Sequence, residues 1–183
     1  GDGKILSELT KKTVVYNFRQ NDLNNGGQGA PLTPIFHKLL INQNKIHLPV
    51  IILNIGGIAN ITGIDLQNTI YSMDIGPGNC LIDQWIRANS KNKDKYDKNG
   101  KIAKSGKINK KILIQALNNW NDKNGALSYD IKDFDLSFVR GLSIEDGAAT
   151  LTEYTSEILY RNLYLSALGP VDTIILSGGG RKN

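Results

Sequence analysis

The stretch Pro49-Val50-Ile51-Ile52-Leu53-Asn54-Ile55-Gly56-Gly57-Ile58-Ala59-Asn60-Ile61-Thr62-Gly63-Ile64 decides the fold. The part before the glycines is a continuous apolar run, the pattern of a β-strand that is covered on both faces. Gly56-Gly57 interrupts the run and the next seven residues resume it, so the sequence predicts a β-hairpin. Residues 65–68 have the composition of a turn, and residues 69–75 are predicted to form a third strand.

Helices and further strands are predicted on both sides of this hairpin. Apolar residues at helical spacing predict helices beginning near Pro31, after Asn79, around residues 112–120 and from Ser143 towards Leu168. Short β-prone runs predict strands at residues 14–18 and 172–176, the first followed by a polar loop over 19–30. Residues 91–107 are predicted to be a polar connection, and residues 121–141 to be irregular. The mixture of strands and helices places the chain in the α/β class.

The composition is that of an ordinary globular protein. Of 183 residues, 40% are hydrophobic and 21% are charged, which excludes a disordered or fibrous protein. The length suits one domain, or one large domain with a fragment of a second. No apolar run approaches the roughly 18 residues of a membrane span, and no signal peptide is expected at the N-terminus. Cys80 is the single cysteine, so no internal disulfide can form and a cytoplasmic setting is expected.

The positive charge of the chain is concentrated in one tract. Residues 91–111 contain nine Lys and two Asp, a net charge of +7, within a chain whose total is +5. The rest of the chain is therefore slightly acidic. The cations are 17 Lys and five Arg, and Arg is the better reader of phosphates and bases. A solvated Lys-rich loop and helix face is favoured over a nucleic-acid-binding surface.

Glycine-bearing segments follow four of the predicted strands, at residues 26–29, 56–57, 76–78 and 178–180. A glycine at such a place lets backbone N–H groups approach an anion, because no Cβ is in the way. One such pair is usually a tight turn. Four of them favour a nucleotide or sugar site, since they have the polar neighbours Asn54, Asn60, Asp74 and Asn79. Neither the Walker A pattern nor the Gly-x-Gly-x-x-Gly fingerprint occurs.

Acidic residues near these glycines are candidate catalytic residues. Asp22 could act as a general base and Arg19 could pair with it or with an anionic substrate, although Asp22 could also simply close a local turn. Asp74 ends a strand where carboxylates reach ligands or metal-bound water, or else forms an Asx turn. Glu153 is either a site residue or a solvated one. His37 is expected to pack or form a hydrogen bond, and the Cys and His spacing predicts no zinc site.

Six motifs in order resemble those of the anhydro-N-acetylmuramic acid kinase family. They are Phe18-Arg19-x-x-Asp22, Gly26-Gly27-Gln28-Gly29-Ala30-Pro31-Leu32, Asn54-Ile55-Gly56-Gly57-Ile58-Ala59-Asn60-Ile61-Thr62, Asp74-Ile75-Gly76-Pro77-Gly78-Asn79, Asp146-Gly147-Ala148-Ala149-Thr150-Leu151-Thr152-Glu153 and Gly178-Gly179-Gly180-Arg181-Lys182-Asn183. The resemblance covers nearly the whole chain. Its poorest part is residues 91–141.

That family belongs to the sugar kinase, heat-shock-70 and actin superfamily. The resemblance therefore implies a ribonuclease-H-like (actin-like ATPase) α/β fold with a mixed sheet and flanking helices, in which residues 49–183 form most of the C-terminal domain and residues 1–48 are a remnant of the N-terminal domain. It also implies an enzyme that uses ATP and Mg²⁺ to open the ring of 1,6-anhydro-N-acetylmuramic acid and to form N-acetylmuramic acid 6-phosphate. A cytoplasmic homodimer that binds neither nucleic acid nor membrane is expected.

The resemblance also implies roles for individual residues. Asp22 would activate the water that attacks the anomeric carbon, and Arg19 would orient that site. No residue is assigned to a metal. The other implied contacts are to ATP phosphates by Gly56 and Gly57, to the adenosine by Gly178, Gly179 and Gly180, and to substrate or the closing cleft by Asp74, Asn79 and Glu153.

The sequence departs from the family pattern in three places. The family's Gly-Thr-Ser-x-Asp-Gly phosphate loop and its His-Gly-Gln motif do not occur, and Asn17 stands where the family usually has Asp. The chain resembles about the second half of the enzyme without its last helices, which predicts little or no activity for the isolated chain. Two alternatives stay open: a catalytically silent fragment or dimerisation module of that kinase, and an anion- or nucleic-acid-binding protein that uses Lys91 to Lys111.

Overall fold

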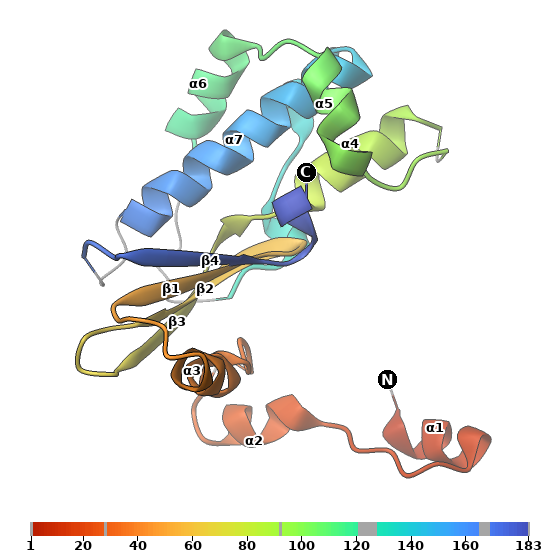
Figure 1. Ribbon diagram of the computed structural model, residues 1–183. Coiled ribbons are helices and arrows are strands. Elements are labelled where there is room, and N and C mark those ends of the chain that lie inside the picture. Colours follow the sequence, from red (N-terminus) through yellow and green to blue (C-terminus); the bar gives the residue numbers. More distant parts are fainter. Residues whose placement is uncertain (1, 28, 92, 121–127, 165–168, 183) are drawn as a thin grey trace.

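A four-stranded mixed sheet lies at the centre of the molecule (Figure 1). The structure is a computed structural model that describes residues 2–27, 29–91, 93–120, 128–164 and 169–182. The strands are β1 (Val50–Ile55), β2 (Ile58–Ile64), β3 (Ile70–Pro77) and β4 (Thr173–Ser177), in the spatial order β3-β2-β1-β4. β1 pairs antiparallel with β2 and parallel with β4, and β2 pairs antiparallel with β3. The predicted hairpin, third strand and final strand are confirmed.

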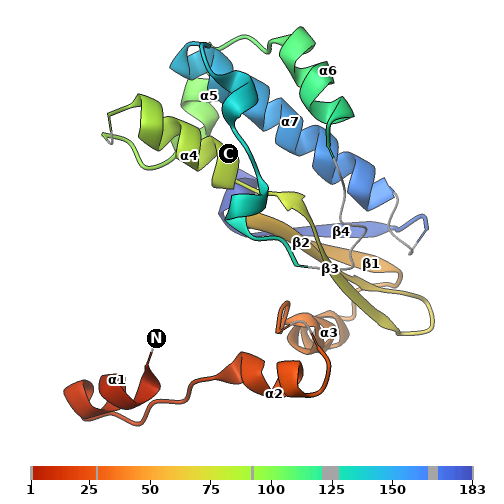
Figure 2. The same ribbon diagram turned by 180° about the vertical axis from the view of Figure 1, so that it is seen from behind.

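Helices cover both faces of this sheet, as Figures 1 and 2 show. α3 (Pro34–Gln43) lies on one face and α7 (Ile144–Tyr164) on the other. Because side chains alternate along a strand, Val50 and Ile52 of β1 face the cluster around α3, whereas Ile51 and Leu53 join the cluster that includes Leu159 of α7. Burial on both faces explains why the β1 sequence is continuously apolar.

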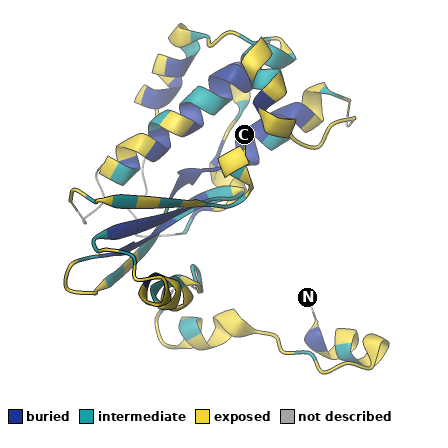
Figure 3. Ribbon diagram, viewed as in Figure 1, coloured by how far each residue is buried: buried dark blue, intermediate teal, exposed yellow. Residues whose placement is uncertain are grey.

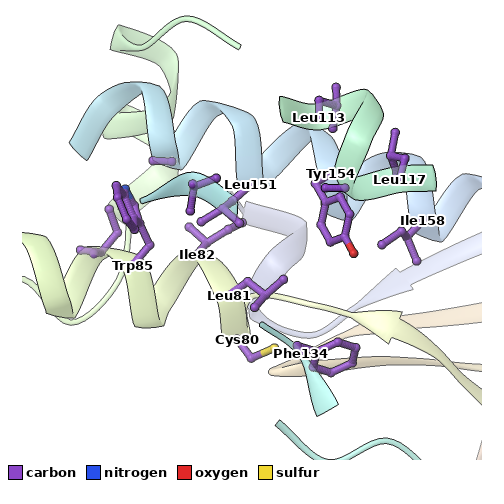
Figure 4. Packing of buried hydrophobic residues seen from close by; sticks show 14 of the residues in the cluster. Cys80, Leu81, Ile82, Trp85, Leu113, Leu117, Phe134, Leu151, Tyr154 and Ile158 are labelled. Carbon is purple, nitrogen blue, oxygen red and sulfur yellow. The ribbon is translucent and has the colours of Figure 1, made fainter. Parts of the chain in front are cut away.

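A second apolar core fills the space between α7 and three shorter helices, α4 (Cys80–Asn89), α5 (Lys101–Ser105) and α6 (Lys110–Asn118). Figure 4 shows its side chains. Leu151 and Ile158 of α7 are 0% exposed and Leu81 and Trp85 of α4 are almost as well buried. Gly147 allows close approach here, because a Cβ at this position would lie 2.3 Å from the Trp85 ring.

The segments that connect these helices contain the short 3₁₀ helices η1 (Lys98–Gly100), η2 (Ile131–Asp133) and η3 (Ser137–Val139), and η4 (Gly179–Lys182) follows β4. The prediction of a polar connection at residues 91–107 is therefore wrong in part, since this stretch holds η1 and α5. The irregular structure expected at 128–141 consists of η2, η3 and turns, and residues 121–127 and 165–168 lie outside the described residues. None of the helices in the described ranges is long and apolar enough to span a membrane.

Residues 2–27, which we call the N-terminal arm, extend away from the sheet (Figure 1). The arm contains α1 (Gly3–Thr10) and α2 (Phe18–Asn24), so the strand predicted at residues 14–18 and the start of the predicted loop at 19–30 are wrong. The β-prone run has no partner strand among the described residues, and a strand needs one to satisfy its backbone. Figure 3 shows how exposed the arm is. Its exposed apolar side chains are Ile5, Leu6, Leu9, Val15, Tyr16, Phe18 and Leu23.

Candidate functional site

A row of polar side chains crosses all four strands at one level of the sheet. Asp74 on β3 pairs with Asn60 on β2, which pairs with Asn54 on β1, which in turn pairs with Ser177 on β4. Residues paired in register point to the same face of a sheet, so these four side chains lie side by side. The Ser177 hydroxyl is 3.1 Å from the Asn54 amide oxygen, to which it donates a hydrogen bond. We call these four residues the polar row.

The polar row lines a pocket of about 450 Å³, which we call the sheet pocket. Residues 29–33 form another part of its wall, and Arg19 reaches it from α2. His37 of α3 also lines it, and its Nδ1 lies 2.8 Å from the Thr62 hydroxyl of β2. Burial lowers the pKa of His37, which favours the neutral ring. The pocket thus combines a guanidinium, a carboxylate, amides and a hydroxyl, the groups that bind a polar, partly anionic molecule.

Asp74 is held by a segment that is distant in sequence. Its Oδ2 accepts a hydrogen bond from the Tyr129 backbone N–H at 3.0 Å. Burial raises the pKa of the Asp74 carboxyl, and the bond from Tyr129 opposes that rise. Because this bond joins residues that are 55 positions apart, Asp74 connects two parts of the fold instead of closing an Asx turn. A carboxylate kept half-buried in a pocket is a candidate functional group.

Asp22 lies directly behind the wall of the sheet pocket. Its Oδ2 accepts a hydrogen bond from the Gly29 N–H at 2.7 Å, and its backbone carbonyl accepts one from Gly27 at 2.8 Å. A Cβ at Gly27 would lie 2.2 Å from the same Oδ2. Asp22 therefore closes the local turn, as one reading of the sequence held. Of the two candidate catalytic residues, Arg19 lines the pocket, and Asp22 positions Gly29, which lines it.

Three of the predicted glycine segments meet at one end of the sheet. The Gly57 carbonyl accepts hydrogen bonds from the N–H groups of Gly78 and Cys80, both at 3.0 Å, and the Gly56 carbonyl accepts one from Asn79 at 2.8 Å. The third segment packs on the end of β1: a Cβ at Gly178 would lie 2.5 Å from the Ile55 carbonyl oxygen. We call residues 56–57, 78–80 and 178–180 the glycine turns. From the fourth segment, Gly29 lines the sheet pocket instead.

A second pocket of about 480 Å³, which we call the turn pocket, has residues of the glycine turns in its wall. It is lined by Asn79, Asp83, residues 96–99, Gly179 and Lys182. Burial raises the pKa of Asp83, and the nearby Arg87 charge opposes that rise. Ser177 lines the sheet pocket and Gly179 lines the turn pocket. Because these residues are two positions apart in the chain, their Cα atoms are at most about 7 Å from each other.

Glu153 and its motif belong to the packing of α7. Glu153 is half-buried and lines neither of the two pockets. Within the same motif, Asp146 Oδ1 accepts a hydrogen bond from the Lys107 N–H at 2.7 Å, and the Thr150 hydroxyl accepts one from the Asn109 N–H at 3.0 Å. These bonds hold residues 106–109 against α7. The motif therefore has a structural explanation in the described residues.

The sheet pocket offers a magnesium ion one carboxylate, that of Asp74. Among the residues that the structure describes, no three His, Cys, Asp or Glu side chains lie close enough together to hold a metal. Mg²⁺ typically takes one or two protein carboxylates and completes its shell with substrate phosphates and water. Asp74 fits such a site, because its second oxygen is not the one that Tyr129 occupies.

Several residues of the two pockets were not singled out as site residues from the sequence. Asn54 and Asn60 are expected only as polar neighbours of glycines, and Ser177 falls between the predicted strand at 172–176 and the glycines at 178–180. Their signal is a polar side chain at the end of an otherwise apolar strand. The register that aligns them becomes visible only in the folded sheet. Residues 96–99 carried no such signal, because they were expected to be a solvated connection.

The whole chain, residues 1–183, matches the model of a family described as anhydro-N-acetylmuramic acid kinase. Curated relatives called anhydro-N-acetylmuramic acid kinase include one from Pelagibacter ubique, which is 54% identical over the full chain, and one from Zymomonas mobilis, which is 42% identical. A third, from Caulobacter vibrioides, is 36% identical. The chain covers 50%, 49% and 48% of these three proteins, so it spans about half the length of the curated relatives it matches.

Proposed function

The chain belongs to the anhydro-N-acetylmuramic acid kinase family, and we propose that it forms part of an ATP-dependent kinase acting on 1,6-anhydro-N-acetylmuramic acid. The observation that carries this proposal is the closeness of two pockets: Ser177 lines one, and Gly179 of the glycine turns, two residues further on, lines the other. Phosphoryl transfer consists mainly of positioning a donor and an acceptor and neutralising charge between them. Two polar pockets separated by one backbone turn suit that task.

The sheet pocket is the proposed sugar site. Asn54 and Asn60 offer amide donors and acceptors to the hydroxyl and acetamido groups of the sugar. Arg19 offers a guanidinium fork that suits the lactyl carboxylate of muramic acid. The residues that line this pocket thus match both the neutral and the anionic parts of the proposed substrate.

Asp22 is the proposed general base. Water is a poor nucleophile, and a carboxylate within hydrogen-bond reach is typically worth about 10²–10⁴ in rate. In the proposed reaction Asp22 takes a proton from the water that attacks the anomeric carbon, the 1,6-anhydro bridge opens, and the freed 6-oxygen accepts the phosphoryl group. The product is N-acetylmuramic acid 6-phosphate. The bond from Gly29 holds the carboxylate beside the pocket wall.

The glycine turns are the proposed contact with ATP. Gly56 and Gly57 bring backbone groups close to the phosphates, whereas Gly178, Gly179 and Gly180 lie by the adenosine. Asn79 is placed between them, on the wall of the turn pocket. Mg²⁺, when bound beside Asp74, would supply charge neutralisation at the phosphates.

The proposed enzyme is larger than the chain described here. Its relatives are about twice as long, and the exposed apolar side chains of the N-terminal arm are of the kind that mark interaction surfaces. We propose that the sheet belongs to a ribonuclease-H-like domain, that residues 1–48 belong to a second domain, and that the active protein is a cytoplasmic homodimer. A complete active site would then use polypeptide outside the matched half.

The proposal is tested by incubating the chain with Mg-ATP and the anhydro sugar and following ³¹P NMR. A sugar 6-phosphate signal that is lost in Asp22→Asn supports the kinase and its base, whereas equal turnover in both proteins removes Asp22 from that role. Tight ATP binding by the chain alone, measured by calorimetry, would count against the alternative of a silent fragment or dimerisation module. Absence of both nucleotide binding and turnover contradicts the proposal that this chain holds the ATP site and favours that alternative.

A further inference from the structure

The Lys-rich tract forms one wall of the turn pocket. Tyr96, Asp97, Lys98 and Asn99 line it, opposite Asn79 and Gly179. This wall was expected to be a solvated connection that touches no site. Its position beside the glycine turns requires another explanation.

The wall is held in a fixed conformation by Asp97. This side chain is 3% exposed, and its two oxygens accept hydrogen bonds from the N–H groups of Ile102 at 2.9 Å and Ala103 at 2.8 Å. Its carboxylate thereby caps the start of α5. Asn99 and Gly100 take left-handed backbone angles, with φ of 59° and 63°, which turn the chain into that helix. A loop built in this way presents its neighbouring side chains without a large ordering cost on binding.

The side chains around the turn pocket match the parts of a nucleotide. Tyr96 is 56% exposed and offers an aromatic face, on which any base can stack. Asp83 offers a carboxylate that suits ribose hydroxyls. Lys98 and Lys182 reach the pocket from two different segments and offer ammonium groups, which suit phosphate oxygens.

Building on the proposed function, we propose that the 96–99 wall sets the enzyme's affinity for its nucleotide, with Tyr96 against the base and Lys98 and Lys182 on the phosphates nearest the ribose. The phosphoryl group to be transferred then points past the glycine turns towards the sheet pocket. The wall would govern nucleotide binding and leave the chemistry on the sugar to Arg19, Asp22 and Asp74.

The geometry favours a single nucleotide over a nucleic-acid strand. The pocket contains one lysine of the Lys-rich tract, Lys98, and Lys182 from the C-terminal segment, together with two carboxylates, Asp83 and Asp97. A nucleic-acid site would need many cations along a continuous path and would show a steep dependence on salt. A compact site of mixed charge suits a small ligand better.

Isothermal titration with ADP tests the wall, using Tyr96→Ala, Lys98→Gln and Lys182→Gln. Each substitution is expected to raise the Kd for ADP about tenfold, since stacking or one charge-assisted contact is lost. Lys111→Gln is the matched control, because Lys111 lies in the same tract, carries the same charge and is exposed outside the pocket. Pyrophosphate is the second probe: Lys98→Gln should weaken its binding, whereas Tyr96→Ala should leave it unchanged.

The outcomes separate this inference from the proposed function. If the unaltered chain binds ADP and all three wall variants bind it as tightly as Lys111→Gln does, the wall assignment is wrong and the kinase proposal stands. If the unaltered chain binds no ADP, both fail. If Lys111→Gln weakens ADP binding as much as Lys98→Gln does, the loss of affinity comes from the lower net positive charge of the tract, and the wall has no specific role. Tight binding of a DNA oligonucleotide with a steep salt dependence would replace the nucleotide by a nucleic acid.

Discussion

The sheet with its covering helices and the N-terminal arm use apolar side chains in opposite ways. In the former, residues such as Ile158 and Val50 are 0% exposed and are surrounded by partners from three or more elements. In the arm, Leu9 is 78% exposed and Val15 is 72% exposed. The arm therefore has little to hold it except local bonds, whereas the rest of the molecule is held by packing across long stretches of sequence. The two regions should respond very differently to matched substitutions.

The largest difference is expected for truncation of an aliphatic side chain. Ile158→Ala removes buried methyl and methylene groups from the core between α7, α4 and α6, and should lower the free energy of unfolding by about 2–5 kcal/mol. Leu9→Ala, in the exposed arm, should change it by less than about 0.5 kcal/mol. Urea denaturation followed by circular dichroism measures both. Similar losses for the two variants would mean that the arm folds as part of the core.

A second difference is expected between two neighbouring glycines. A Cβ at Gly78 would lie 2.2 Å from the Gly56 carbonyl oxygen, whereas nothing lies within 4 Å of a Cβ at Gly57. Gly78→Ala should therefore cost about 1–3 kcal/mol, because backbone must move to admit the methyl group. Gly57→Ala should cost much less. Thermal unfolding of the two variants tests this, and an equal loss would show that the turns do not meet as described.

A third comparison uses two carboxylates that make the same kind of bond. Asp146 accepts an N–H from Lys107, and Asp22 accepts one from Gly29, both at 2.7 Å. Asp146→Ala should lower the free energy of unfolding by about 1 kcal/mol, because it releases a segment packed on α7. Asp22→Ala should leave global unfolding nearly unchanged, since the arm is only locally held. Hydrogen exchange should instead show the Gly29 amide losing protection in that variant.

The smallest effect is expected at Asp74, and it should depend on pH. Because burial raises the pKa of Asp74 in the folded protein, the ionised carboxylate opposes folding once the pH exceeds its usual range. Asp74→Asn removes that charge and keeps an oxygen that can accept from Tyr129. The variant should match the unaltered protein in acid and become relatively more stable as the pH rises through the raised pKa. Melting temperatures between pH 4 and 7 measure this, and a constant difference would contradict it.

The strands of the sheet could be predicted because their patterns are decided by their own residues. The apolar run at residues 50–55 is buried on both faces, and Gly56-Gly57 makes a turn wherever it falls between two strands. The run at residues 14–18 has similar β-prone composition but forms no strand. A strand also needs a partner, and the sequence of the arm carries no information about whether one is present. For the same reason α1 was not predicted from the sequence. Its apolar side chains are exposed and pack against no core in the described residues.

The site could be predicted from the sequence only where the backbone conformation requires one residue type, which here is glycine. Glycines were expected to gather at the strand ends, and three of the four segments do so. The polar row depends on the register between β3, β2, β1 and β4, which includes a bulge at Ala59 and Asn60 that no local pattern reveals. The 96–99 wall depends on Asp97 capping a helix five residues away. The register arises from the fold as a whole, whereas the Asp97 cap is local and lies in a stretch whose Lys-rich composition predicts a solvated connection.

The most direct test asks whether the glycine turns are where the nucleotide binds. The chain is labelled with ¹⁵N-glycine and titrated with Mg-ADP, and the amide signals are followed by NMR. Shifts concentrated at Gly56, Gly57 and residues 178–180 are predicted, with Gly141 and Gly169 unchanged, because those two glycines lie outside the glycine turns and line neither pocket. Saturable shifts that leave the glycine turns untouched, or no shifts at any glycine, would contradict a donor site between the sheet pocket and the turn pocket.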